Sequence, residues 1–277
     1  MNTIKVGRID FLNILPIYHY LDQYSSDIQL IQKVPSALNR LLQEGELDVG
    51  PISSFSYAEN ADQYVVFPNL SVSSIGKVRS IFLFSKRPIE QLHGAKIALT
   101  NTSATSIHLL KVLLEKYHSC YPTYSVMPPD LPSMLAEHDG ALLIGDDAFV
   151  DPATYQTPLY RYDLGEMWNA LTDCSMTFAV WAVRKDAIER DHAGLVAVYE
   201  AFIRSKEQGL ANLDQVIQAA EEKFPRGYQF WKDYYSGLNY DFNPSMIEGL
   251  NRFFADCHEC GYLKHPVQTE VWGDVIE

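Results

Sequence analysis

Hydroxyl side chains gather where expected strands end, most densely in TNTSATS at residues 100–106. This stretch leads directly into apolar residues with helical spacing. A helix N-terminus has unpaired backbone N–H groups and a favourable dipole, so hydroxyls placed there can help to bind a carboxylate or a phosphate. We therefore regard Thr102, Ser103, Thr105 and Ser106 as candidate ligand-binding residues. The alternative is that Ser103 or Thr105 only caps the helix.

Two further strand ends carry small polar residues. Asn13 lies in the loop that starts at Asp10, and Ser53 and Ser54 follow the strand-like LDVG. Ligands of α/β proteins bind beyond the carboxyl ends of the strands, so these loops are expected to meet at one site. Asn13 could instead cap a helix or form an Asx-turn, and the serines could likewise be caps.

Charged and glycine residues near other strand ends extend this list of candidates. Gly145 ends the apolar run ALLIG, and Asp146 and Asp147 follow it; one of the two carboxylates could cap the next segment while the other faces a cleft. Lys77 and Arg79 lie in SVSSIGKVRS and could contribute positive charge to an anion site, although such side chains are commonly solvated at the surface.

Composition limits the classes of partner. The chain has 277 residues, of which 47% are hydrophobic, and this is enough for one large core or two ordinary ones. A formal net charge of −13 argues against nucleic-acid or anionic-membrane partners, so local donors must hold any anionic ligand. The first residues contain no apolar run of signal-peptide length, and no segment approaches the ~20 apolar residues of a membrane span. We therefore expect a cytoplasmic protein.

Motifs for nucleotides and metals are weak or missing. Neither GxxxxGK[ST] nor GxGxxG occurs, which argues against a nucleotide ligand. Cys257 and Cys260 form the motif CHEC, but Cys120 and Cys174 are distant in sequence and zinc needs four ligands. We therefore expect no metal site and interpret Cys257 and Cys260 as small hydrophobic residues of a C-terminal helix.

The order of the expected elements indicates an α/β fold with largely parallel sheets. Strands are expected at residues 5–9, 28–33, 47–52, 64–67, 79–85, 96–100, 141–145 and 177–184. Helices are expected at residues 15–24, 36–43, 106–117, 187–205, 210–223, 227–236 and 245–260. The last four helices have no strands between them and must pack on a sheet formed earlier. We predict a discontinuous first lobe of residues 1–85 and 180–277, with residues 86–179 inserted as a second lobe.

Several segments together resemble the chorismate dehydratase family of the futalosine route to menaquinone. They are GRIDFLNILPIY, GELDVGPISSFSYA, LSVSSIGKVRSIFLFS, TNTSATSIHLLKVLL, ALLIGDDA, YDLGEMWNALTDCSMTFAVWAVR and NYDFNPSMIEGLNRFF, in chain order. The resemblance covers nearly the whole chain. It implies the two-lobed type 2 periplasmic-binding-protein-like fold, with a ligand cleft between the lobes. It also implies a lyase that removes water from chorismate to give 3-[(1-carboxyvinyl)oxy]benzoate, without a metal or organic cofactor.

The resemblance also assigns roles to residues. The family's motif asparagine falls on Asn13, its motif serine falls on Ser80, and its hydroxyl-rich loop falls on residues 102–106. In CSMTFAVW the residues before FAVW are more polar than in similar sequences, which makes the hinge side of the pocket less typical. The sister family that makes 1,4-dihydroxy-6-naphthoate shares the fold, but its N-terminal signature with proline and cysteine is absent.

Chorismate is a small dicarboxylate, so a cleft that binds it needs two anion sites. We expect the hydroxyl-rich helix start of the second lobe to hold one carboxylate and the Ser53–Ser54 turn of the first lobe to hold the other. Elimination removes the C3 proton and the C4 hydroxyl, and the candidate bases are His108, Asp146 and the enolpyruvyl carboxylate of chorismate itself. The competing functions are a non-catalytic binding protein for a small carboxylate and a ligand-sensing domain of a transcription regulator.

Overall fold

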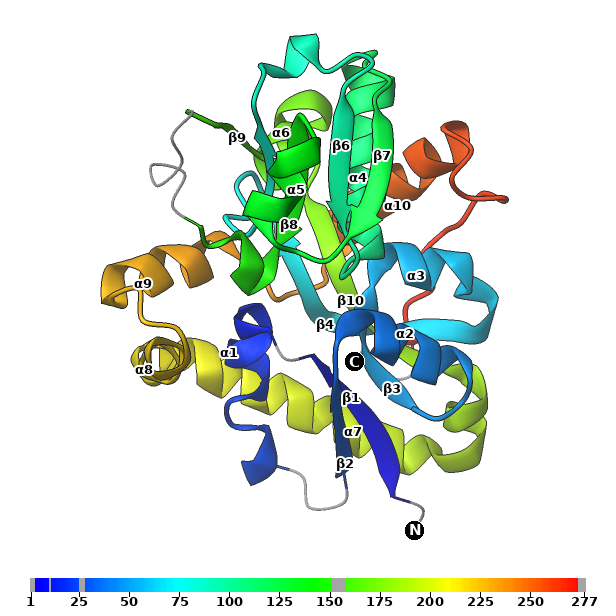
Figure 1. Cartoon of the computed structure of the whole chain (residues 1–277). Coiled ribbons are helices and arrows are strands. Elements are labelled where there is room, and N and C mark those ends of the chain that lie inside the picture. The colour runs from blue at the N-terminus through cyan, green and yellow to red at the C-terminus, as the bar shows by residue number, and fades with distance from the viewer. Residues whose placement is uncertain (1–2, 10, 25–27, 151–157, 274–277) are drawn as a thin grey trace.

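The computed structural model describes residues 3–9, 11–24, 28–150 and 158–273, and within them the strands form two five-stranded sheets (Figure 1). The first sheet has the order β2-β1-β3-β10-β4. Its strands are β1 (Ile4–Ile9), β2 (Ile28–Lys33), β3 (Val49–Ser53), β4 (Tyr64–Ser74) and β10 (Met176–Arg184). The second sheet has the order β7-β6-β8-β5-β9. Its strands are β5 (Ile81–Ser85), β6 (Lys96–Thr100), β7 (Thr123–Met127), β8 (Gly140–Ile144) and β9 (Tyr160–Asp163).

Both sheets are mixed, so the expectation of largely parallel sheets is wrong. β1 is parallel to β2 and β3, and β6 is parallel to β7 and β8. β10, however, is antiparallel to both β3 and β4, and β5 is antiparallel to both β8 and β9. The reason is the path of the chain: β4 leaves the first sheet, and β10 returns to it from the second sheet and therefore runs in the opposite direction.

The chain passes between the sheets twice, as Figure 1 shows for the long strands β4 and β10 near the middle of the molecule. The first passage lies between Ser74 and Ile81, because β5 already belongs to the second sheet. A division by sheets would therefore place this boundary earlier than residue 85. The return passage lies between Asp163, where β9 ends, and Met176, where β10 begins.

Ten α-helices are assigned within the described residues, including the four expected after the last strand. They are α1 (Leu15–Tyr18), α2 (Pro35–Gln43), α3 (Ser54–Glu59), α4 (Ala104–Val112), α5 (Leu131–Glu137), α6 (Leu164–Thr172), α7 (Lys185–Ala211), α8 (Leu213–Lys223), α9 (Tyr228–Gly237) and α10 (Pro244–Glu259). The C-terminal helices do not pack on the first sheet alone. On α9, Phe230 contacts Phe149 of the second half of the fold, and on α10, Asp256 accepts a hydrogen bond from Lys116.

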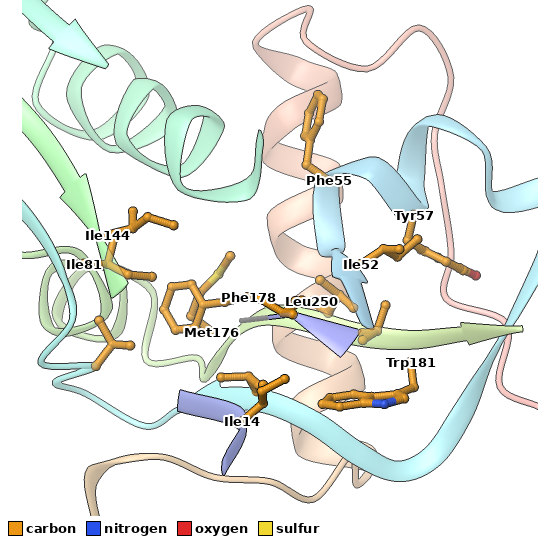
Figure 2. Packing of buried hydrophobic residues seen from close by; sticks show 14 of the residues in the cluster. Ile14, Ile52, Phe55, Tyr57, Ile81, Ile144, Met176, Phe178, Trp181 and Leu250 are labelled. Carbon is orange, nitrogen blue, oxygen red and sulfur yellow. The ribbon is translucent and has the colours of Figure 1, made fainter. Parts of the chain in front are cut away.

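One apolar cluster connects the two sheets. It contains Ile81 and Ile144 from the second sheet together with Met176 and Phe178 from β10, and Figure 2 shows these four side chains close to one another. A smaller second cluster lies on the other face of the second sheet, around Phe84 and neighbouring residues. Across the described residues, none of the helices combines the length and the apolar character that crossing a bilayer requires.

Candidate active site

A pocket lies between the two sheets at the ends of several strands. Its described lining residues are Ile9, Phe11, Asn13, Pro35, Ser53, Val72, Val78, Ser80, Ile81, Thr102, Ser103, Ser106, Ile144, Gly145, Phe178 and Ala179. Seven of the residues singled out from the sequence are among them, namely Asn13, Ser53, Ser80, Thr102, Ser103, Ser106 and Gly145. Asp10, the first residue of the Asn13 loop, lies outside the described residues.

Matching serine caps begin the two helices that meet at this pocket. Ser53 accepts a hydrogen bond from Ser56 N at the start of α3, and Ser103 accepts one from Ser106 N at the start of α4. In each pair the first hydroxyl also donates to the second, at 3.0 Å in α3 and 3.1 Å in α4. Capping and pocket lining are therefore combined in the same serines, so the two interpretations of the sequence do not exclude each other.

Three predicted binding residues do not line the pocket, because their side chains serve contacts inside the protein. The hydroxyl of Ser54 donates to Thr177 O at 2.8 Å and is fully buried. Thr105 Oγ1 accepts a hydrogen bond from Phe55 N at 2.9 Å, which joins α4 to α3. Asp146 accepts a hydrogen bond from Leu12 N at 3.4 Å.

The Asn13 side chain carries an unused acceptor. Its Oδ1 atom is buried and has no hydrogen-bond partner among the described residues, although the residue lines the pocket. Its backbone is held from the C-terminal part of the chain, since Tyr240 donates to Asn13 O at 2.9 Å and Tyr235 donates to Leu12 O at 3.1 Å. Leaving a buried acceptor unpaired is costly, so Asn13 is suited to receive a donor from a ligand.

Ser80 and Gly145 form the opposite side of the pocket. Gly145 N donates to Ser80 O at 2.7 Å, and Gly145 has a φ of 56°, a conformation that favours glycine. A Cβ atom at this position would lie 3.5 Å from the ring of Phe11. Among the described residues, the Ser80 hydroxyl makes a long hydrogen bond of 3.5 Å to Val78 O, and its interaction with the Tyr234 hydroxyl partly offsets the rise that burial causes in the pKa of Tyr234. Both contacts are weak enough for the Ser80 hydroxyl to turn toward a ligand.

The remaining lining residues are apolar and were not predicted from the sequence. Phe11, Ile81, Ile144 and Phe178 were interpreted only as parts of strands or loops, because an apolar residue at a strand end looks the same whether it faces a core or a ligand. None of the described lining residues carries a side chain that ionises near neutral pH. The described walls of the pocket thus offer hydroxyls, an amide, backbone groups and apolar surface.

His108 lies away from the pocket, so the structure does not support it as the general base. Its ring stacks on Phe55 with 3.5 Å between ring centroids, and its Nδ1 atom lies 2.9 Å from Ala104 O. Burial is the main cause that lowers the pKa of His108, from 6.5 to about 4, and nearby Lys111 lowers it further. The imidazole is therefore neutral at pH 7 and acts as a packing element between α3 and α4.

The lowered pKa of His108 predicts an acid-sensitive component of stability. The unfolded chain binds a proton at His108 below about pH 6.5, whereas the folded chain does so only near pH 4. Stability from this residue is therefore lost as the pH falls between these values. When the pH is lowered from 7 to 4.5, the unfolding free energy of both proteins is expected to fall. We expect this drop to be about 2 kcal/mol smaller in His108→Gln than in the wild type. Urea unfolding at both pH values measures this, and equal losses would contradict it.

Lys77 and Arg79 lie outside the pocket as well. Both line a separate, wider hollow of about 340 Å³, where Lys77 Nζ is 3.3 Å from a carboxylate oxygen of Glu166. The CHEC cysteines lie at the end of α10, where Cys257 is buried and burial raises the pKa of its thiol. Among the described residues, no group of three or more His, Cys, Asp or Glu side chains is arranged to hold a metal ion.

Comparisons with known proteins agree with this architecture. Residues 4–259 match the family model described as menaquinone biosynthesis. The chain is 33% identical over 233 residues to the chorismate dehydratase of Thermus thermophilus, covering 79% of this chain and 82% of that protein. It is 25% identical over 181 residues to the 1,4-dihydroxy-6-naphtoate synthase of the same organism, covering 65% of this chain and 63% of that enzyme.

Solved structures show the same fold at low sequence identity. The periplasmic aliphatic sulphonate binding protein of Escherichia coli superposes with a TM-score of 0.68 at 14% identity, over 98% of both chains. The expected two-lobed periplasmic-binding-protein-like fold is thereby confirmed. With the family match over nearly its whole length, the chain belongs to the menaquinone biosynthesis family.

Proposed function

We propose that this protein is a chorismate dehydratase, a carbon–oxygen lyase that eliminates water from chorismate to give 3-[(1-carboxyvinyl)oxy]benzoate. The observation that carries the proposal is the pocket itself, where hydroxyls from both sheets and the unpaired Oδ1 atom of Asn13 face one small space. The similarity to the Thermus thermophilus chorismate dehydratase supports it and exceeds the similarity to the naphthoate enzyme, 33% against 25% identity.

The two carboxylates of chorismate would be bound by uncharged donors. At the start of α4, Ser106 accepts the hydroxyl proton of Ser103 and donates its own to one carboxylate, assisted by the positive end of the helix dipole. Ser53 on the opposite wall serves the other, once its hydroxyl turns from Ser56 Oγ to the ligand. Hydrogen bonds to a charged acceptor are among the strongest in proteins, so hydroxyl donors can hold the dianion without a Lys or Arg side chain.

The polar groups near the ring would control the departing hydroxyl. Asn13 Oδ1 accepts the hydrogen of the C4 hydroxyl, which fixes the direction of the C4–O bond. Ser80 turns its hydroxyl from the long bond to Val78 O and donates its proton to the same oxygen as negative charge develops on it. Apolar neighbours such as Phe11 and Phe178 exclude water and strengthen both hydrogen bonds.

The proton acceptor would be the substrate. The described lining residues include no carboxylate, imidazole or amine, and His108 is packed against Phe55. The enolpyruvyl carboxylate of chorismate takes the C3 proton, the electrons of that C–H bond form a ring double bond, and the C4–O bond breaks. The released hydroxide combines with the proton carried by the carboxylate, so one water leaves and the ring becomes aromatic.

The pocket must widen for this substrate to enter. Its volume is about 60 Å³, whereas pockets for small ligands commonly occupy ~300 Å³ or more. The lobes meet through contacts such as the hydrogen bond from Phe55 N to Thr105 Oγ1, which can part and re-form as a ligand enters.

Incubating the purified protein with chorismate and following the aromatic product by absorbance and mass spectrometry tests the proposal. We expect stoichiometric conversion to 3-[(1-carboxyvinyl)oxy]benzoate. Tight binding of chorismate without conversion would instead support a carboxylate-binding protein. Absence of both would exclude chorismate as the ligand.

A further inference from the structure

Asp163 connects the start of α6 to the turn that precedes Ser80. Asp163 is buried, with 6% of the residue exposed. One oxygen of its carboxylate accepts hydrogen bonds from Val78 N and Glu166 N, both at 3.1 Å, and the other accepts one from Arg79 N at 2.7 Å. The bond to Glu166 N is an ordinary helix cap. The two bonds to Val78 and Arg79 reach 85 and 84 residues back along the chain and are not needed for capping.

The turn held by Asp163 has a backbone shape that needs support. Arg79 has a φ of 63°, a left-handed conformation that is unfavourable for a residue with a large side chain. A carboxylate that accepts consecutive backbone N–H groups stabilises such a shape strongly, because the acceptor is charged. The next residue is Ser80, so the direction in which the chain leaves Arg79 determines where the Ser80 hydroxyl lies.

The contact between α6 and this turn is close. A Cβ atom at Gly165 would lie 2.5 Å from Gly76 O and 2.8 Å from Ser74 Oγ, so only glycine allows the helix to approach this far. This approach brings the Asp163 carboxylate within reach of the turn. Beyond the turn, the backbone of Ser80 is held by a hydrogen bond of 2.7 Å that Gly145 N donates to Ser80 O.

We propose that Asp163 is a positioning residue for dehydration: by holding the Val78 and Arg79 amides, it places the Ser80 hydroxyl against the departing oxygen of the substrate. This inference rests on the proposed function, because it assumes that Ser80 acts in the elimination. Asp163 does not line the pocket, and its effect on the reaction passes through the backbone of the turn.

Asp163→Asn tests this role. Asparagine keeps one oxygen that can accept a hydrogen bond, but its NH₂ group replaces the other oxygen and faces a backbone N–H that it cannot accept. We expect kcat for chorismate to fall about 10-fold or more with the dissociation constant of chorismate changed less than threefold. Asp163→Ser is the second variant, since serine keeps the helix cap but cannot reach both amides of the turn. We expect it to have the same effect on kcat.

The matched control is Asp130→Asn. Asp130 caps α5 by accepting a hydrogen bond from Ser133 N at 3.0 Å, and it does not contact the turn or line the pocket. Asparagine also caps helices well, so the same Asp-to-Asn change at a helix cap that does not hold the turn should leave kcat unchanged. If the Asp163 variants changed thermal stability but kept the kcat of the wild type, the inference would be overturned.

A double-mutant cycle separates action through Ser80 from a general disturbance. If Asp163 acts through Ser80, adding Asp163→Asn to Ser80→Ala lowers kcat no further, whereas independent effects multiply. Multiplying effects would overturn the inference while leaving the proposed function intact. A Ser80→Ala variant with the kcat of the wild type would also overturn it, whereas failure of the proposed function would show as a wild-type protein that does not convert chorismate.

Discussion

Replacing Asn13 by alanine is expected to lower kcat for chorismate dehydration about 100-fold, the usual effect of removing one hydrogen-bonding group from a reacting oxygen. The reason is the buried Oδ1 atom, which has no partner among the described residues and lies where the C4 hydroxyl would leave. Steady-state kinetics that follow the aromatic product measure the change. We expect a smaller change in KM, because the carboxylates are held elsewhere.

Asn101→Ala is the matched control for this experiment. Asn101 directly follows β6, at the end of the second sheet that faces the pocket. Its side chain is exposed and it is not among the described lining residues, so its replacement should leave kcat within twofold of the wild type. Undiminished turnover of Asn13→Ala would remove Asn13 from the mechanism. Equal losses in the two variants would indicate a general disturbance of the loops and not a role at the reacting oxygen.

Replacing Gly209 by valine is expected to cost about 4 kcal/mol of unfolding free energy. Gly209 lies on α7, where a Cβ atom would be 2.0 Å from Pro16 O of α1, so the two helices could not keep their present distance. The neighbouring bond from Ser205 Oγ to Ile17 O, 2.6 Å long, would be disturbed as well. At 2–4 °C per kcal/mol, this corresponds to a Tm lower by roughly 10 °C.

Gly273→Val serves as the control, since a Cβ atom there would meet nothing within 4 Å among the described residues and Tm should stay close to that of the wild type. Urea unfolding and thermal melting of both variants measure the difference. Because α1 begins two residues after Asn13, we also expect Gly209→Val to lower kcat in the fraction that remains folded. A Tm for Gly209→Val equal to that of the control would contradict the prediction.

Much of the fold follows from the sequence, because apolar periodicity and helix caps are local signals. β2 and β6 have the predicted bounds, and the four C-terminal helices lie within a few residues of theirs apart from the longer α7. β4 was predicted to end at Phe67 but continues to Ser74, since its serines are satisfied by remote partners. Ser73 Oγ lies 2.8 Å from Thr177 Oγ1, and no local pattern reveals a partner 104 residues away.

The site was predictable in its loops but not in the direction of each side chain. Of the adjacent pair Ser53 and Ser54, the first lines the pocket and the second bonds to Thr177 O. Neighbouring residues of one type point to opposite sides, and composition does not distinguish them. The tyrosines that hold the Asn13 loop were also missed, because Tyr235 and Tyr240 lie more than 220 residues from their partners.

Ile81, Ile144 and Phe178 belong to one apolar cluster that limits how far the two lobes can move apart. A large rotation of one lobe away from the other would expose these side chains to water, at a free-energy cost of about 25 cal/mol for each Å² of apolar surface. Admission of substrate should therefore depend on small local displacements near the serine caps. The half of the fold built on the second sheet would expose this apolar surface to water if it unfolded separately from the other half, so we expect heating to unfold both halves together in one transition.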